Sequence, residues 1–251
     1  MPELIILGSA AAIPNLEHDN THMMIQTGDG VVLIDCGTAP MLRLERVGIP
    51  TNDITDIILT HFHPDHISGL PLLLMSMWLA GRRKALRIYG LHHCLKRVED
   101  LMGFYQWGDW PEFFPVAFHR LPENERVMVL EQGEVTIYSS PVCHVIPTIG
   151  LRIEAKSTGK VIAYSCDTEP CQAVINLAQG ASVLIHEASG ESVGHSSAVQ
   201  AGEIARDAGV DNLYLIHYPV GDSDMASLEE EARGVFLGDV WLAEDFMKIE
   251  F

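Results

Sequence analysis

One short run of residues, His61-Phe62-His63-Pro64-Asp65-His66, constrains this chain more than any other feature of its sequence. The run ends a buried-strand pattern that begins at Asp56, and it precedes an apolar stretch of helical length from Ile67 onward. Strand alternation places His61 and His63 on one face, and Pro64 stiffens the turn so that Asp65 and His66 open the helix. This density of imidazole and carboxylate predicts a metal site, and its geometry suits two adjacent ions better than one.

The sequence defines the ligand residues of this site more firmly than the identity of the metal. Imidazole and carboxylate groups without thiolates favour zinc, and they also admit iron, manganese or cobalt. A catalytic zinc site in addition keeps one coordination position open. The sequence therefore predicts two divalent metal ions, with zinc preferred and manganese or iron as alternatives.

Short apolar runs with strand character alternate with turn signals and helical patterns in both halves of the chain. This arrangement predicts an α/β (α+β) fold in which two sheets pack face to face with helices outside. No linker or low-complexity tract interrupts it, so residues 1–251 are expected to form a single domain. The other predicted strands are 4–7, 23–26, 31–35, 135–139, 148–155, 160–164, 183–186 and 213–217, and the helices are 171–178 and 197–208.

Charge limits the partners of the chain. It carries 16 Lys and Arg against 34 Asp and Glu, a net charge of −18, which argues against general nucleic-acid binding because basic side chains supply phosphate-backbone affinity. Residues 161–251 hold only 3 of the basic residues and 16 of the acidic ones. The one dense basic cluster, Arg82, Arg83, Lys84 and Arg87, is interpreted as a solvated helix end, with an RNA contact as the alternative.

Compartment signals are few. The apolar stretch 70–80 has about half of the roughly 20 residues that a membrane helix needs, so no membrane association is expected. The chain start lacks a basic region and a cleavage pattern, which favours the cytoplasm over secretion. Five scattered cysteines without a C-x-x-C pair fit reduced thiols better than a disulfide framework.

The His61–His66 run resembles the H-x-H-x-D-H signature of the metallo-β-lactamase superfamily, and the resemblance continues along nearly the whole chain. The segments 7–9 and 33–37 look like the opening strands of that fold. His144, Asp167 and His217 look like its later metal motifs. The resemblance implies a four-layer αββα sandwich of the metallo-β-lactamase type.

The same resemblance implies the ligand set. One metal would be held by His61, His63 and His144, and the second by Asp65, His66 and His217, with Asp167 bridging both. A hydroxide between the metals would be the nucleophile of a hydrolytic reaction.

Two further segments indicate which branch of the metallo-β-lactamase superfamily the chain resembles. Residues 185–189 and 194–198 are similar to the HEAT and HST motifs of ribonuclease Z, whose members cleave phosphodiesters at the 3′ end of precursor tRNA. His195 is expected to assist the leaving oxygen, since an imidazole with a near-neutral pKa suits that task. Glu187 is expected to orient His195, unless it is merely solvated. The predicted catalytic residues are thus His195, Glu187 and Asp65.

The sequence differs from ribonuclease Z in features that bear on which substrate the chain would bind. Only 22 residues separate His144 from Asp167, too few for the long tRNA-binding arm, and Cys166 stands where the family usually has Gly. The missing arm and the acidic C-terminal third disfavour tRNA. A small phosphodiester or a short RNA remains as the expected substrate.

An aromatic-rich insertion at about 70–118 lies between the first and third metal motifs. Its segment 104–114 holds 6 of the 18 aromatic residues. A lid over the metals, a homodimer interface and core packing are the three interpretations.

The sequence thus favours a dinuclear metal-dependent hydrolase, namely a ribonuclease-Z-like phosphodiesterase. A lactone or carboxylic ester hydrolase using the same metal site is the alternative. A non-catalytic metal-binding module is less favoured, because all seven expected ligands are present.

Overall fold

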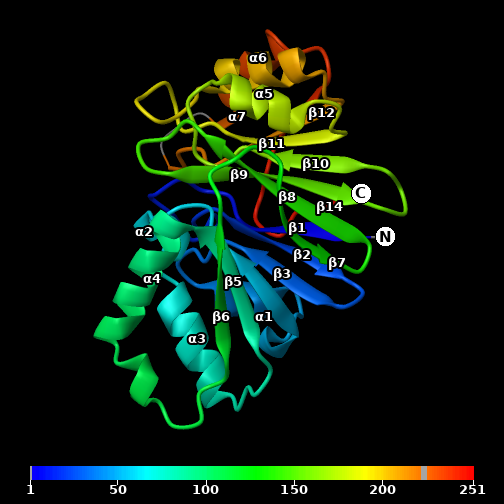
Figure 1. The fold of residues 1–251 in the computed structure, drawn as a ribbon. Helices are drawn as coiled ribbons and strands as arrows, with labels where there is room; N and C mark the ends of the chain where they lie inside the picture. Colours follow the sequence, from blue (N-terminus) through cyan, green and yellow to red (C-terminus); the bar gives the residue numbers. More distant parts are fainter. Residues whose placement is uncertain (1, 222–224) are drawn as a thin grey trace.

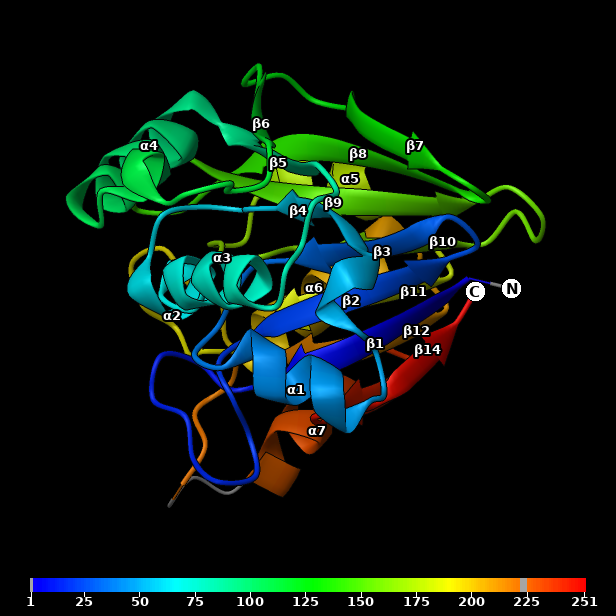
Figure 2. The same ribbon diagram turned by 90° about the horizontal axis from the view of Figure 1, so that it is seen from below.

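Two seven-stranded sheets lie face to face, with helices on their outer faces, in a computed structural model of the chain that describes residues 2–221 and 225–251 (Figures 1 and 2). The first sheet has the strand order β14-β1-β2-β3-β4-β5-β6, and the second has the order β13-β12-β11-β10-β9-β8-β7. The strands of the first sheet are β1 (Glu3–Gly8), β2 (His22–Thr27), β3 (Gly30–Ile34), β4 (Ile54–Ile58), β5 (Leu86–Leu91), β6 (Val116–Leu121) and β14 (Lys248–Glu250). Those of the second are β7 (Val127–Gln132), β8 (Val135–Val142), β9 (Thr148–Ala155), β10 (Val161–Tyr164), β11 (Val183–Glu187), β12 (Asn212–Ile216) and β13 (Asp239–Leu242).

The helices divide between the two sheets. Among the described residues, four α-helices accompany the first sheet and three accompany the second. In Figure 1 they form the lower and upper outer layers. The first group is α1 (Pro40–Arg46), α2 (Pro64–Ile67), α3 (Leu70–Leu79) and α4 (His92–Phe104), with short 3₁₀ turns η1 (Thr51–Asp53) and η2 (Trp107–Asp109). The second group is α5 (Gln172–Ala178), α6 (Ala198–Ala208) and α7 (Met225–Arg233).

Side-chain alternation along the strands builds the layers. In β1, Leu4 and Ile6 face the core between the sheets, whereas Ile5 and Leu7 face the core under the helices of the first sheet. The second sheet repeats this pattern along 161–164, whose residues alternate between the shared core and the core under α5 and α6. Because both faces of these strands are buried, their sequences read as continuous apolar runs. The predicted four-layer αββα sandwich is confirmed.

The strand directions decide where a site can form. Strands β3 to β6 pair in parallel, as do β10 to β13. Loops that follow the carboxyl ends of parallel strands meet at one edge of a sheet, which is where ligands bind in such folds. The loops after β4, β10, β11 and β12 are therefore brought together.

The chain after His63 forms two helices rather than the one predicted from Ile67 onward. Helix α2 begins at Pro64 and α3 begins at Leu70, with Gly69 between them. A Cβ atom at Gly69 would lie 2.0 Å from the carbonyl oxygen of Gly37, so only glycine allows this close approach. The break seats α2 directly against the loop after β3.

Arg82 corrects the interpretation of the basic cluster as a solvated helix end. Its side chain is 1% exposed, and its guanidinium donates hydrogen bonds to the carbonyl oxygens of Ile54, Lys84 and Ala85. Arg87 is bound to the buried carboxylate of Asp56. Arg82 is therefore internal because its guanidinium satisfies backbone carbonyls, whereas Arg87 stays exposed and pairs with the buried charge of Asp56.

The aromatic segment 104–114 packs partly into the core at the far end of α3 and α4. Trp110 stacks on Trp78 with ring centroids 5.0 Å apart, and Phe114 is buried. Phe104 and Tyr105 are exposed. None of the segment's residues is among those that line the hollow over the metal-ligand cluster in the described chain, so within one chain the lid interpretation is wrong.

No helix among the described residues is both long and apolar enough to cross a membrane.

Candidate metal centre

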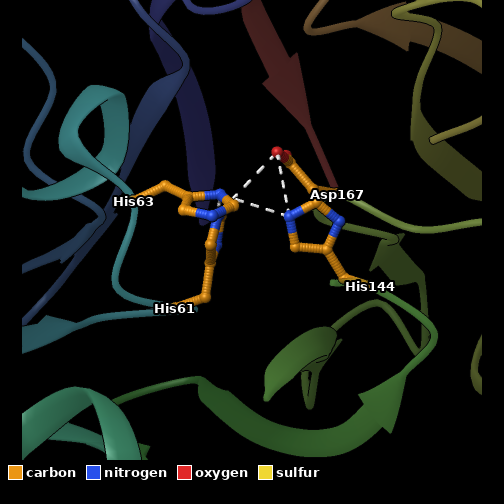
Figure 3. A group of neighbouring side chains, drawn as sticks. All are labelled: His61, His63, His144 and Asp167. Atoms are coloured by element: carbon orange, nitrogen blue, oxygen red, sulfur yellow. Dashed lines mark hydrogen bonds and ion pairs between the residues drawn. The ribbon is translucent and has the colours of Figure 1, made fainter. Parts of the chain in front are cut away.

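Four predicted ligands from distant parts of the chain converge at the edge between the two sheets (Figure 3). His61 and His63 follow β4, His144 follows β8, and Asp167 follows β10. His63 Nδ1 lies 3.1 Å from His61 Nε2 and 3.2 Å from His144 Nε2. Asp167 Oδ2 lies 3.8 Å from His61 Nε2 and 4.0 Å from His144 Nε2. The four side chains point at one another around a common centre (Figure 3).

A second group shares Asp167 with the first. His217 Nε2 lies 3.3 Å from Asp65 Oδ2, and His66 Nε2 lies 3.7 Å from the same oxygen. Asp167 reaches this group through both oxygens, with Oδ1 3.4 Å from His66 Nε2 and Oδ2 3.6 Å from His217 Nε2. The structure thus places all seven predicted ligands together, in two groups with one carboxylate in common.

The outer nitrogen of most of these imidazoles is fixed by a hydrogen bond. His66 Nδ1 donates to Asp35 Oδ2 at 2.9 Å, and His144 Nδ1 donates to the carbonyl oxygen of Gly194 at 2.7 Å. His217 Nδ1 lies 2.7 Å from Ser189 Oγ, whose own proton goes to the carbonyl oxygen of His217. With Nδ1 protonated, Nε2 carries the lone pair that faces the centre, which is the arrangement that metal-ligating histidines need.

Asp35 supports two ligands at once, a role that the sequence reasoning missed. Besides His66, it accepts hydrogen bonds from the backbone N–H and the hydroxyl of Thr60. Because that hydroxyl donates to Asp35, its oxygen is left to accept from His61 Nδ1, 3.1 Å away. Asp35 is fully buried in a left-handed backbone conformation at φ 60, an unusual geometry for a residue other than glycine and the signal that marks it.

The donor set fits divalent metal ions. His66 Nε2 and Asp167 Oδ1 are buried and have no hydrogen-bond partner within the described chain. An unpaired polar atom in the interior is costly, so its orientation toward a cluster of donors indicates that another group completes it. Imidazole and carboxylate donors are those that Zn²⁺, Mn²⁺ and Fe²⁺ accept.

The charges of the cluster support this assignment. Burial and the neighbouring His66 lower the pKa of His61 well below its ordinary value, which keeps that ring neutral. Burial would raise the pKa of Asp167, but His217 and His66 outweigh burial and hold it well below its usual range. Burial also lowers the pKa of His63 and His144, so the first group presents neutral imidazoles beside an ionised carboxylate. In the second group Asp167 and other carboxylates raise the pKa of His66 and His217 against the effect of burial, which makes this group a site that attracts positive charge.

His195 stands at the mouth of the cluster, and Glu187 at the end of β11 holds it. His195 Nδ1 donates to Glu187 Oε1 at 2.9 Å, and this hydrogen bond raises the pKa of His195 against the effect of burial. Glu187 is fully buried and also accepts the backbone N–H groups of Thr168 and Ser189. The expected orienting contact is present, and Glu187 is not solvated.

Helix α6 fixes the other side of the His195 loop. Ser197 caps the helix in a capping box with Gln200, so the chain direction is set two residues after His195. Gly194, at φ +85, places its carbonyl on His144, and its N–H donates to Glu169 Oε1 at 2.8 Å. The loop that carries His195 is thereby tied to the loops that carry His144 and Asp167.

Cys166 lies behind the cluster rather than inside it. Its Sγ is 3.6 Å from His61 Nδ1, the nitrogen that faces away from the other ligands. Burial raises the pKa of the Cys166 thiol well above its ordinary value, so it stays protonated. This thiol therefore lies on the side of the His61 ring that is turned away from His63 and His144.

A hollow of about 400 Å³ opens over the cluster. Its polar lining comes from the ligands, from His195 and from two serines, and no Lys or Arg is among its lining residues in the described chain. Its apolar lining comes from two loops, those after β1 and β12, and comprises Ala11, Ala12, Ile13, Pro219 and Val220. This volume is in the range of small-molecule sites.

Comparison with known proteins assigns the family. A family model described as Anti-Pycsar protein Apyc1 matches residues 2–237. The chain belongs to the Anti-Pycsar protein Apyc1 family. It is also 28% identical to a Ribonuclease Z from Methanothermobacter thermautotrophicus, with 100% of this chain and 97% of that protein covered, and 28% identical to a Ribonuclease BN from Cronobacter sakazakii, with 98% and 99% covered.

Solved structures agree with the fold of this Apyc1 family member. The metallo-β-lactamase fold protein YhfI from Bacillus subtilis superposes with a TM-score of 0.85 at 23% identity, covering 100% of this chain and 99% of that one. The short form of human tRNase Z gives 0.79 at 23% identity, covering 99% and 98%. The predicted resemblance to the ribonuclease Z-like branch without a long arm is confirmed, since only β9, β10 and short turns lie between His144 and Asp167.

Proposed function

We propose that this chain is a dinuclear metal-dependent hydrolase that cleaves small phosphodiesters. The observation that carries the proposal is Asp167, whose two oxygens face two groups of ligands, with an oriented imidazole beside them. The first metal would be held by His61, His63 and His144, and the second by Asp65, His66 and His217, with Asp167 shared. Zinc is the preferred metal, and manganese or iron would satisfy the same donors.

Two adjacent divalent ions supply an activated water and stabilise negative charge on the attacking and leaving oxygens of the phosphate. The chain itself contributes the geometry and a proton. Glu187 accepts the Nδ1–H of His195 and raises the pKa of His195, which favours a second proton on Nε2. That proton is available to the leaving oxygen, whose departure is otherwise slow. Asp65 Oδ2 lies 3.3 Å from His217 Nε2, so these two atoms would hold the second metal together.

The hollow favours a small substrate over a long polyanion. Its volume of about 400 Å³ admits a small ligand, and its lining provides no basic side chain to follow a phosphate backbone in the described chain. The apolar loops beside the ligands would contact a nonpolar or aromatic part of that ligand. Small cyclic and linear phosphodiesters are therefore the proposed class, and tRNA is disfavoured.

The test is the initial rate of zinc- or manganese-loaded protein on an aryl phosphodiester and on small cyclic and linear diesters. His195→Ala at equal metal content is expected to lower the rate at least tenfold, since positioned general acids contribute about 10²–10⁴-fold. His92→Ala, an exposed histidine on α4, is the matched control and is expected to leave the rate unchanged.

Hydrolysis of lactones or carboxylic esters is the second candidate, which the apolar lining of the hollow favours. A fully metallated protein that cleaves these esters but no phosphodiester would replace the proposal with this one. Absence of hydrolysis on either class from folded, dimetallic protein would indicate a binding module.

A further inference from the structure

Two cysteines lie side by side immediately behind the metal-ligand loops. Cys143 precedes the ligand His144, and Cys171 is the N-cap residue of helix α5, four residues after the ligand Asp167. Cys143 is exposed and Cys171 is half-buried, whereas Cys36, Cys94 and Cys166 are buried. The two accessible thiols of the chain are therefore the two that neighbour each other.

Backbone contacts hold the two segments together. The N–H of Glu169 donates to the carbonyl oxygen of Cys143 at 2.7 Å, and the N–H of Cys143 donates to Thr168 Oγ1 at 3.2 Å. The same hydroxyl lies 3.8 Å from Cys171 Sγ. The Thr168 hydroxyl thus lies against both the backbone of Cys143 and the sulfur of Cys171, and both cysteines are free thiols.

We propose that Cys143 and Cys171 form a reversible oxidation site, whose disulfide cross-links the loop of His144 to the loop of Asp167. Disulfide formation requires two segments already in register, because the Cα atoms of a bridged pair usually lie about 4.4–6.8 Å apart. The hydrogen bonds that Cys143 makes with the Glu169 N–H and with the Thr168 hydroxyl supply that register. The cross-link itself is independent of the proposed phosphodiesterase activity.

The reaction balances with a small-molecule disulfide such as oxidised glutathione. The exposed Cys143 sulfur attacks one sulfur of the reagent, breaks its S–S bond and releases one glutathione thiol. The Cys171 sulfur then attacks the Cys143 sulfur of the mixed disulfide and releases the second glutathione thiol. The two protons of the cysteine thiols end on the two released thiols, and the protein is oxidised by two electrons.

The consequence concerns the two ligands that the cysteines flank. A disulfide between these loops prevents them from moving apart, so a metal ion held by His144 and Asp167 leaves more slowly. The buried cysteines contribute nothing to this effect, because they are closed to a reagent of this size.

The test incubates metal-loaded protein with oxidised glutathione and measures free thiols after denaturation, together with peptide masses. We expect the number of titratable thiols to fall from five to three, with a peptide link between Cys143 and Cys171 that a reductant removes. The Cys143→Ser/Cys171→Ser variant is expected to keep all of its thiols. Stable glutathione on Cys143 alone, a link between chains, or no thiol loss would overturn the proposal.

Metal release provides a second readout. Transfer of zinc to a chelator is expected to slow several-fold in the oxidised protein and to recover after reduction, whereas the double serine variant shows no dependence on the oxidant. An unchanged release rate in fully cross-linked protein would overturn the inferred effect on the metal centre. Neither readout requires a substrate, so failure here is distinguishable from failure of the proposed function.

Discussion

The Glu187→Gln variant tests two contributions of one buried carboxylate: its contribution to the free energy of unfolding and its effect on the pKa of His195. Oxygen Oε1 of Glu187 accepts from His195 Nδ1 and the Thr168 N–H, both at 2.9 Å, and Oε2 accepts from the Ser189 N–H at 3.0 Å. A glutamine has the same shape, but its NH₂ group must take the place of one of the two carboxylate oxygens. If the NH₂ group takes the place of Oε2, only one contact is lost, and the Ser189 N–H then faces another hydrogen-bond donor.

The magnitude follows from these three contacts. An unsatisfied buried donor costs about 1–3 kcal/mol, and the two remaining hydrogen bonds lose the extra strength that a charged acceptor gives. We expect the free energy of unfolding to fall by about 3 kcal/mol. The His195 side chain is 24% exposed, so the Glu187 charge is only partly screened there, and its loss lowers the pKa of His195.

The assay is the initial rate on a phosphodiester as a function of pH, at matched metal content, together with denaturant unfolding. His195 donates a proton only while it is protonated, so the rate falls as pH rises through its pKa. Because Glu187 raises that pKa, Glu187→Gln moves this fall to lower pH. Glu191→Gln, an exposed acid in the same loop, is the matched control and moves neither quantity.

A double variant makes the reasoning refutable. If Glu187 acts on the reaction through His195, then Glu187→Gln has no effect on the rate of His195→Ala, although it still lowers stability. Equal rate losses in both backgrounds, or an unshifted pH profile in Glu187→Gln alone, would show that Glu187 does not act by holding His195.

Three further outcomes are expected. Asp167→Asn lowers the bound metal to less than one ion per chain in elemental analysis, because this residue serves both ligand groups. Gly194→Ala weakens metal binding about tenfold in a chelator competition, since its Cβ would lie 2.9 Å from a ligand imidazole, whereas Gly190→Ala, equally strained in φ but with open space, leaves metal binding unchanged. Arg82→Met loses the hydrogen bonds of a buried guanidinium to backbone carbonyls and lowers the free energy of unfolding by about 3 kcal/mol, whereas the exposed Arg83→Met changes it by less than about 0.5 kcal/mol in denaturant titration.

Strands and helices with clear side-chain periodicity were the easiest elements to predict from sequence. Strand β9 coincides with the predicted 148–155, and α6 begins one residue after the predicted start because Ser197 is its cap. Period-two and period-3.6 patterns are local, so they survive without knowledge of the fold. The run from His61 to His66 is local in the same sense, and it identified both ligand groups.

The remaining features depend on contacts across the fold. Asp35 stands 31 positions before His66, and no local pattern indicates that it holds two ligand imidazoles. Arg82 sits in a basic run whose composition is typical of a helix end, and only the packing of β4 and β5 buries it. Edge strands such as β14, with three residues, are too short to give a periodic signal.

The centre draws its donors from both sheets, with His61 to His66 on the first and His144, Asp167 and His217 on the second. An ion bound there would cross-link the two sheets, because unfolding of either sheet would remove part of its ligands. A ligand that binds only the native chain adds about 2.7 kcal/mol of stability at one hundred times its dissociation constant. Metal supply would then govern how long each molecule persists before it unfolds, as well as how fast it turns over substrate.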